Sequence, residues 1–400
     1  MTLSGWPCCA LLAVLPWATL YAQEKQGDSQ DKPAVVGLPD FRPKSMLVVT
    51  ATNLSHGKFP SIDIHTHFGF RLRGSTEQLE QYVQVMDENH IAVSVSLDAM
   101  LGKSLDEHRR FLCDKYPDRF AIFVYLDWQG DGTADDWASW DCQRPDFARR
   151  SAALLERAKA EGACGVKFFK QFGLEYRNPD GSLIQIDDRR WDPIWEGCGK
   201  LGLPVIIHTA DPAAFFLPID ASNERYEELL RHPEWSFYGG DFPTRESLLE
   251  ALNRVIERFP QTNFIGAHVA NNAEDLATVS HWLDRYPNLY LDTASRIAEL
   301  GRQPHTAREF FLKYQDRIVF GTDGPWPSQR LGYYWRFFET HDEYFPYSEK
   351  EFPPQGLWHI YGLELPDEVL KKIYLENACR IVPGLSAKYE RAAANLSGNR

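Results

Sequence analysis

The sequence is poor in cysteine and contains no CxxC pair, the spacing used by cysteine zinc sites and dithiol redox centres. Two of its seven cysteines, Cys8 and Cys9, fall in an apolar segment at the N-terminus. The others form an odd set that is scattered along the chain, so we predict neither a disulfide framework nor a particular pair: Cys113, Cys142, Cys164, Cys198 and Cys379.

Positive charge is scarce as well. Lysine and arginine number 43 against 56 aspartates and glutamates, which gives a formal net charge of -13. This acidic balance aids solubility and argues against nucleic acid and anionic membranes as partners. The remaining composition, with 44% hydrophobic and 25% charged residues, is typical of a globular protein, and 400 residues allow a large core.

Charged side chains are absent from residues 1–22. The apolar run CALLAVLPWATLYA ends there in a small-residue pattern that is typical of secretory cleavage sites. We therefore predict a signal peptide over 1–22, a flexible polar leader over 23–45, and export to the periplasm or the extracellular space. An uncleaved anchor is the alternative, although the run is short for a span and contains Pro16. No stable membrane insertion is expected after cleavage.

Short apolar runs alternate with amphipathic helical patterns from residue 46 to about residue 390. This alternation indicates parallel βα units, and eight units favour an α/β fold of the (β/α)8 TIM-barrel type in a single domain over 46–390, followed by a tail over 391–400. An open doubly wound sheet is the alternative, but no GxGxxG motif supports it. The predicted strands are 61–68, 92–99, 120–127, 165–170, 204–209, 263–269, 289–294 and 317–323.

Two long polar loops, 210–246 and 324–365, follow the fifth and eighth predicted strands. In a barrel, such loops lie at the C-terminal face, where active sites are built. The first helical pattern carries an apolar stripe with Leu79 and Met86, and Ser75 and Gln78 are spaced as a helix cap before it.

The segment IDIHTH in the first predicted strand carries His65 and His67. Side chains alternate between faces along a strand, so the two imidazoles share one face and can reach one metal ion. Histidine is a common ligand at such sites, and the HxH pair therefore predicts metal binding.

Four further ionisable residues lie near the ends of other predicted strands: Lys167, His208, His268 and Asp323. Each has a structural interpretation when taken alone, such as a hydrogen-bonded histidine or a turn aspartate. In a closed barrel, however, the same ends of all strands converge on one pocket. We therefore expect these side chains to meet the HxH pair.

The chain resembles the amidohydrolase superfamily, in particular the amidohydrolase-related branch that includes decarboxylases similar to aminocarboxymuconate-semialdehyde decarboxylase. The resemblance rests on IDIHTH, GVKFFK, VIIHTADP, FIGAHVAN and RIVFGTD in barrel order, over residues 60–325, and on LENACRIV near the C-terminus. These motifs are specific for the superfamily and far less specific for the substrate.

The resemblance implies roles for the same residues. His65, His67, His208 and Asp323 match the metal ligands of mononuclear members, and His268 matches a group that polarises substrate or acts in acid–base catalysis. Lys167 matches a lysine that binuclear members carbamylate. Lys170 is the alternative for this role, although its side chain would point to the opposite face of the strand. One divalent ion is expected rather than two, and nitrogen and carboxylate ligands suit Zn²⁺, with Mn²⁺ or Fe²⁺ as alternatives.

These residue types predict an exported hydrolase that cleaves a small amide, lactone or ester with metal-activated water. Asp323 would act as the base and then the acid, and His268 would polarise the carbonyl. We expect Arg296, Asp211 and Trp326 to contact a small substrate, which Arg296 would hold through a carboxylate. The main alternative is non-oxidative decarboxylation of an unsaturated or aromatic acid. A phosphoesterase and a non-catalytic binding protein are further alternatives, and the monomeric or homodimeric state stays open.

Overall fold

The computed structural model describes residues 35–37, 40–41, 43–350 and 354–398. The predicted signal peptide and most of the predicted leader lie outside the described residues. The chain divides into two units, Met1–Val48 and Val49–Arg400. The described residues of the first unit are exposed, and every named helix and strand belongs to the second unit.

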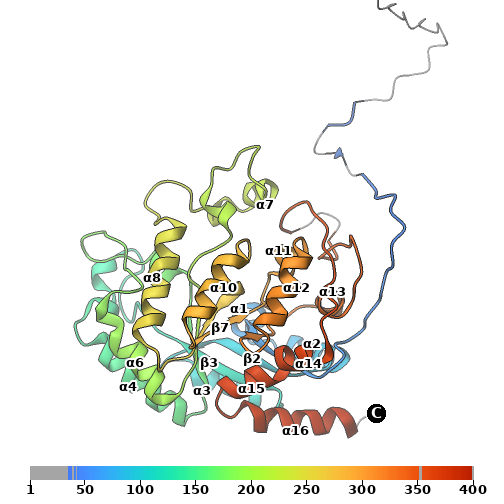
Figure 1. The fold of residues 1–400 in the computed structure, drawn as a ribbon. Coiled ribbons are helices and arrows are strands. Elements are labelled where there is room, and N and C mark those ends of the chain that lie inside the picture. Colours follow the sequence, from blue (N-terminus) through green and yellow to red (C-terminus); the bar gives the residue numbers. More distant parts are fainter. Residues whose placement is uncertain (1–34, 38–39, 42, 351–353, 399–400) are drawn as a thin grey trace, which may run out of the picture. The chain divides into compact units, whose positions relative to one another are not determined.

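Eight parallel strands form one sheet in the order in which they occur along the chain, which confirms the barrel prediction (Figure 1). Backbone hydrogen bonds join β1 to the segment that directly follows β8, from Ile64 N to Phe320 O (3.0 Å) and from Asp323 N to His65 O (2.8 Å). The strands are β1 Ser61–Thr66, β2 Ile91–Met100, β3 Phe120–Tyr125, β4 Gly165–Phe168, β5 Val205–Ile207, β6 Phe264–Gly266, β7 Leu289–Asp292 and β8 Ile318–Val319.

Helices connect the strands and surround the sheet. The connecting helices are α1 Phe68–Leu72, α2 Thr76–Glu88, α3 Leu105–Cys113, α4 Phe147–Ala160, α5 Gln171–Leu174, α6 Asp192–Leu201, α7 Tyr226–Arg231, α8 Arg245–Arg258, α9 Ala267–Ala270, α10 Leu276–Arg285, α11 Ile297–Gly301 and α12 Pro304–Lys313. After β8 come α13 Ser328–Glu339, α14 Asp367–Lys371, α15 Asn377–Ile381 and α16 Leu385–Gly398, so the segment expected as a tail is helical to Gly398.

The local sequence explains where α2 begins. Ser75 Oγ accepts a hydrogen bond from Gln78 N at 3.3 Å, as the capping pattern predicts. Leu79 and Met86 of the apolar stripe are buried against the barrel. No helix in the described part of the chain has the length and apolar character needed to span a bilayer.

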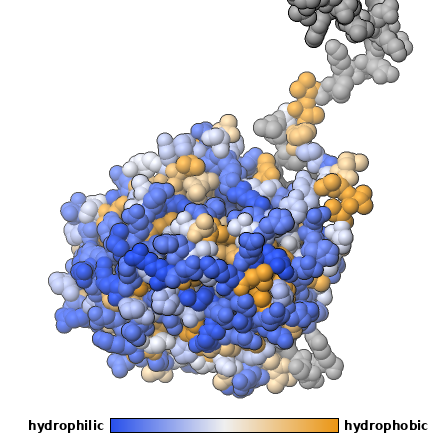
Figure 2. Space-filling view, viewed as in Figure 1, coloured by the Kyte–Doolittle hydropathy of each residue, from blue (hydrophilic) through white to orange (hydrophobic). Residues whose placement is uncertain are grey.

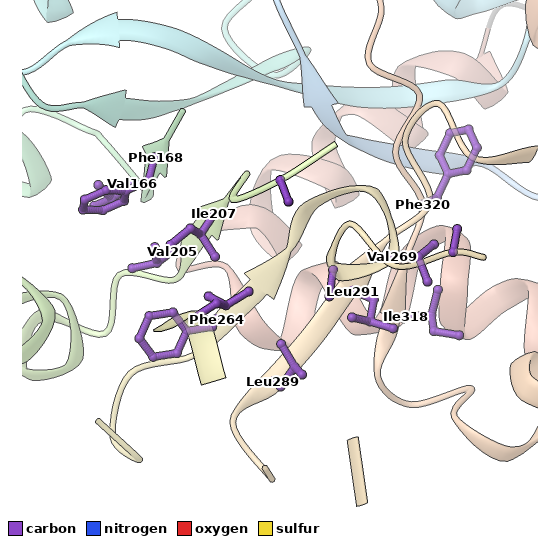
Figure 3. Packing of buried hydrophobic residues seen from close by; sticks show 14 of the residues in the cluster. Val166, Phe168, Val205, Ile207, Phe264, Val269, Leu289, Leu291, Ile318 and Phe320 are labelled. Carbon is purple, nitrogen blue, oxygen red and sulfur yellow. The ribbon is translucent and has the colours of Figure 1, made fainter. Parts of the chain in front are cut away.

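The alternation of side chains along each strand builds two apolar clusters. Val205 and Ile207 point outward to the layer between sheet and helices, with Phe264 and Leu291 of neighbouring strands (Figure 3). Ile206, between them in sequence, belongs to the second cluster, which C-terminal residues such as Ile381 also join. Each fully buried side chain of this size contributes about 1.5–3 kcal/mol to folding. The exposed face in Figure 2 is mostly hydrophilic with scattered apolar residues.

Several strands end earlier than the sequence predicts. β5, β6 and β8 end before His208, His268 and Asp323, so these residues lie just beyond the strands, with His268 in the short element α9. The backbone turns sharply there, since His268 has φ 58° and Asp323 has φ 63°. A left-handed conformation cannot continue a strand, so these side chains are aimed by turns.

Candidate metal centre

Three of the expected ligands meet at the C-terminal end of the barrel. The ligand atoms of His65, His67 and Asp323 all lie within 4.8 Å of one another. Asp323 Oδ1 is 3.3 Å from His67 Nε2 and 3.9 Å from His65 Nε2. A second group that meets the same 4.8 Å limit consists of His65, His268 and Asp292.

His208 borders this site without belonging to either group of three. Its ring lies edge-on to that of His268, with 4.5 Å between centroids. Its Nε2 is 3.3 Å from Asp211 Oδ1, and Asp211 Oδ2 accepts a hydrogen bond from Lys170 Nζ at 2.5 Å. The carboxylate of Asp211 therefore contacts both the His208 imidazole and Lys170. We propose metal ligation by His208 on the basis of the sequence motif.

Two carboxylates that our sequence analysis missed orient the HxH pair. Asp98 Oδ1 is 2.6 Å from His67 Nδ1, and Asp292 Oδ2 is 2.8 Å from His65 Nδ1. A carboxylate on one ring nitrogen fixes the tautomer and leaves the other nitrogen as a metal ligand. Both aspartates lie near the ends of strands, in SLDAM and LYLDTA. This position is the feature of the sequence that could have identified them as partners of the histidines.

Asp292 also braces the turn that carries His268. Its Oδ1 accepts hydrogen bonds from His268 N at 2.8 Å and from Ala294 N at 3.1 Å. The turn has positive φ at four successive residues, 268–271, including the β-branched Val269 at 59°. Such strain persists only where surrounding contacts enforce it, and it clusters at functional sites. His268 Nδ1 lies 2.8 Å from the carbonyl of Ala294, which can only accept, so Nε2 carries the free lone pair.

The protonation states suit a metal centre. Burial lowers the pKa of His65 well below its usual value, and the nearby charge of Lys167 lowers it further. Burial also lowers the pKa of His268 strongly, so both imidazoles are neutral. Burial opposes ionisation of Asp323, but the hydrogen bond with His67 and the charge of that ring hold its pKa well below the usual range. Neutral imidazoles and an ionised carboxylate are the forms that bind a cation.

This donor set fits a divalent cation. The imidazoles of His65 and His268 are neutral. Burial opposes a charge on His67, but its hydrogen bonds with Asp323 and Asp98 raise its pKa, so a bound cation would displace the proton from this ring. Carboxylates hold the second ring nitrogens of His65 and His67, and the ionised carboxylate of Asp323 faces both rings. Nitrogen and oxygen donors in this number match zinc, manganese or ferrous iron. His65, His67 and Asp323 would hold the ion, with His208 and His268 beside it.

The two lysines of the GVKFFK motif have separate environments. Lys167 in β4 is buried, and its Nζ lies 3.4 Å from His65 Nε2. Burial lowers its pKa to about 8. Among the described residues it forms no ion pair, whereas Lys170 is paired with Asp211. Only Lys167 therefore adjoins the ligand cluster, as strand parity predicts.

A cavity of about 420 Å³ opens beside the cluster, and we call it the basic cavity because six lysines and arginines line it. All three expected substrate contacts border it. Arg296 is buried, donates to the carbonyl of Ser295 at 2.9 Å, and forms no ion pair with any described residue. The guanidinium carbon of Arg71 lies over the ring of Trp326, 4.2 Å from the ring centroid. The basic residues are Arg71, Lys170, Arg225, Arg296, Arg330 and Lys350.

Asp292→Asn should weaken metal binding by about 10- to 100-fold, the usual effect of losing an outer hydrogen bond to a ligand. One amide oxygen cannot accept from both the His65 ring and the His268 backbone, so one of them loses its anchor. Competition with a chromophoric chelator measures the affinity. Asp220→Asn, at an exposed loop aspartate bonded to Ser222, is the control, and equal affinities in the two variants would contradict the orienting role.

A protein-family model described as amidohydrolase matches residues 62–384 of the chain. A search of curated proteins found no match.

Similar solved structures include 2,6-dihydroxybenzoate decarboxylase from Rhizobium, 18% identical over 82% of this chain and 98% of that chain, with a TM-score of 0.47. Dihydroxybenzoic acid decarboxylase from Polaromonas sp. JS666, with bound manganese and 2-nitroresorcinol, is 19% identical over 82% and 96%, with a TM-score of 0.48. 4-Oxalomesaconate hydratase from Rhodopseudomonas palustris is 15% identical over 84% and 99%, with a TM-score of 0.47. Similarity at this level does not extend to the reaction.

Proposed function

The chain belongs to the amidohydrolase family, and on that premise we propose that it hydrolyses a small amide, lactone or ester that carries an acidic group. The observation that carries the proposal is the carboxylate of Asp323. It is ionised, it lies within 3.3 Å of His67 Nε2, and its second oxygen accepts from Ser295 Oγ at 3.0 Å. These contacts support a role for Asp323 as a general base at the ligand cluster.

A divalent cation at this position would act as a Lewis acid that activates water and polarises a substrate carbonyl. Asp323 takes a proton from the attacking water, whose oxygen bonds to the acyl carbon. The bond from that carbon to nitrogen or oxygen breaks, and Asp323 returns the proton to the leaving atom. His268 is neutral, so its Nε2 serves as a ligand or as a hydrogen-bond acceptor and does not carry charge.

The basic cavity supports an acidic substrate. The guanidinium of Arg296 is buried and, among the residues that the structure describes, hydrogen-bonds only to a backbone carbonyl. A buried cation of this kind is stabilised by a bound anion. Arg71 adds a second guanidinium 3.9 Å from Asp323 Oδ1. A substrate carboxylate would form a paired contact with Arg296.

Lys167 favours a second candidate function, non-oxidative decarboxylation. Its buried Nζ has no carboxylate partner among the described residues and lies 3.4 Å from His65 Nε2. A carboxylate held there, at the metal position, would compensate this charge. In that case the carbon–carbon bond to the carboxylate breaks, carbon dioxide leaves, and a proton is delivered to the remaining carbon.

Turnover in oxygen-18 water separates the two reactions. Metal-loaded protein is incubated with a panel of lactones, amides, esters and aromatic acids, and chelator-treated protein is the control. We expect metal-dependent incorporation of one heavy oxygen into the acid product. Carbon dioxide release without incorporation would replace the first candidate by the second. Export is a separate proposal that rests only on the apolar N-terminal segment.

A further inference from the structure

A second cavity, of about 290 Å³, adjoins the candidate metal centre. We call it the aromatic cavity because Phe70, Tyr125, Trp128, Phe169 and Tyr176 line it, with Lys167 as its cationic group. A cavity of about 150 Å³ is enough for a benzene ring, so this one has room for a substituted ring.

Three of the rings pack against one another and form one wall of the cavity. The Phe169 ring lies 5.3 Å from Tyr125 and 5.7 Å from Phe70, and the Phe70 and Tyr125 rings are 6.2 Å apart. These are the centroid separations at which aromatic rings attract one another. Phe70 is 51% exposed although it lies next to the site, so part of an apolar face remains available to a ligand. The Tyr125 hydroxyl makes no hydrogen bond with any residue that the structure describes.

The aromatic cavity borders the ligand cluster through Lys167, and the basic cavity borders it through Asp323. His65 Nε2 is 3.4 Å from Lys167 Nζ, which lines the aromatic cavity, and 3.9 Å from Asp323 Oδ1, which lines the basic cavity. The rings of Phe70 and Phe169 lie 5.9 and 6.0 Å from the His67 ring. A substrate with its cleavable bond at His65 and Asp323 therefore has one cavity available for each of its two ends.

We propose that the aromatic cavity is a ring-binding subsite. The substrate is then an amino acid whose nitrogen carries an aromatic acyl group, or a close analogue. Its ring packs in the cavity against the wall of Phe70, Tyr125 and Phe169, its amide lies at the ligand cluster, and its carboxylate pairs with Arg296. The position of the amide rests on the proposed hydrolysis. The position of the ring rests on the cavity alone.

Binding of neutral probes tests the ring subsite without turnover. We expect metal-loaded protein to bind benzamide roughly tenfold more tightly than cyclohexanecarboxamide in calorimetric titrations, since ring contacts add to apolar burial. Phe70→Ala should remove most of this preference, with Phe70→Leu as a second variant if the first is unstable. Tyr238→Ala, at an exposed ring outside the cavity, should keep it. Equal affinity for both probes, or an unchanged preference in the Phe70 variants, would overturn the subsite.

Cleavage of matched substrates tests the whole assignment. N-Benzoylglycine should have a higher kcat/KM than both N-acetylglycine, which lacks the ring, and N-benzoylmethylamine, which lacks the carboxylate. Arg296→Gln should abolish the preference for the carboxylate and leave the preference for the ring. Equal cleavage of N-acetylglycine would overturn the ring subsite and keep hydrolysis. Ring preference in the titrations without cleavage of N-benzoylglycine would support the subsite and refute the hydrolytic role.

Discussion

Asp323→Asn should lower turnover by about 10²- to 10⁴-fold, the usual contribution of a positioned general base, and it should leave the barrel folded. The carboxylate faces the HxH pair through Oδ1, so the amide removes both a charged ligand and the proton acceptor. Asparagine tolerates positive φ well, and the backbone at φ 63° is therefore preserved. The loss is expected in kcat at saturating metal, measured together with thermal unfolding.

Ser295→Ala is a control with a smaller expected effect on turnover than Asp323→Asn. It removes the 3.0 Å hydrogen bond from Ser295 Oγ to Asp323 Oδ2 and retains the charge, so the loss should stay below about tenfold, as for a single hydrogen bond. Near-wild-type turnover of metal-loaded Asp323→Asn would remove Asp323 from the mechanism.

The double variant His65→Ala with His67→Ala should lose its metal altogether. Wild-type protein is expected to hold about one equivalent, and the variant should hold almost none, because two of the three clustered ligands are gone. Elemental analysis after gel filtration measures the content. Added metal should raise the unfolding temperature of the wild type only, since ligand binding to the folded state stabilises it by about 4 kcal/mol at 1,000 times Kd.

A matched double variant provides the control. His281→Ala with His305→Ala removes two imidazoles from the exposed faces of α10 and α12, and neither belongs to a group of possible ligands among the described residues. Its metal content and its response to added metal should equal those of the wild type. Unchanged stoichiometry in the His65 and His67 variant would contradict the assignment of the centre.

Most of the barrel follows from local patterns in the sequence. Strands such as β1 and β7 are short apolar runs with alternating faces, and each is followed by a helical pattern, so their order along the chain is their order in the sheet. The face shared by His65 and His67 follows from strand parity alone. The convergence of strand ends then brings Asp323 to this pair.

The orientation of the site depends on contacts that no local pattern contains. Asp98 and Asp292 hold imidazoles that are 31 and 227 residues away in the sequence. Asp211 contacts His208 Nε2 and accepts a hydrogen bond from Lys170, while Lys167 lies beside His65. Hydrogen bonds between distant residues exist only once the loops have packed.

By itself, the sequence determined the eight-stranded barrel, the shared face of the HxH pair and the set of polar residues at the strand ends, because strand periodicity and chain order are local properties. Only the tertiary structure decided which ring nitrogens face the site, that Arg296 has no carboxylate partner among the described residues, and that two unlike cavities border the ligand cluster. Those features arise where side chains from different strands and loops approach within hydrogen-bond distance, and their geometry is fixed by packing.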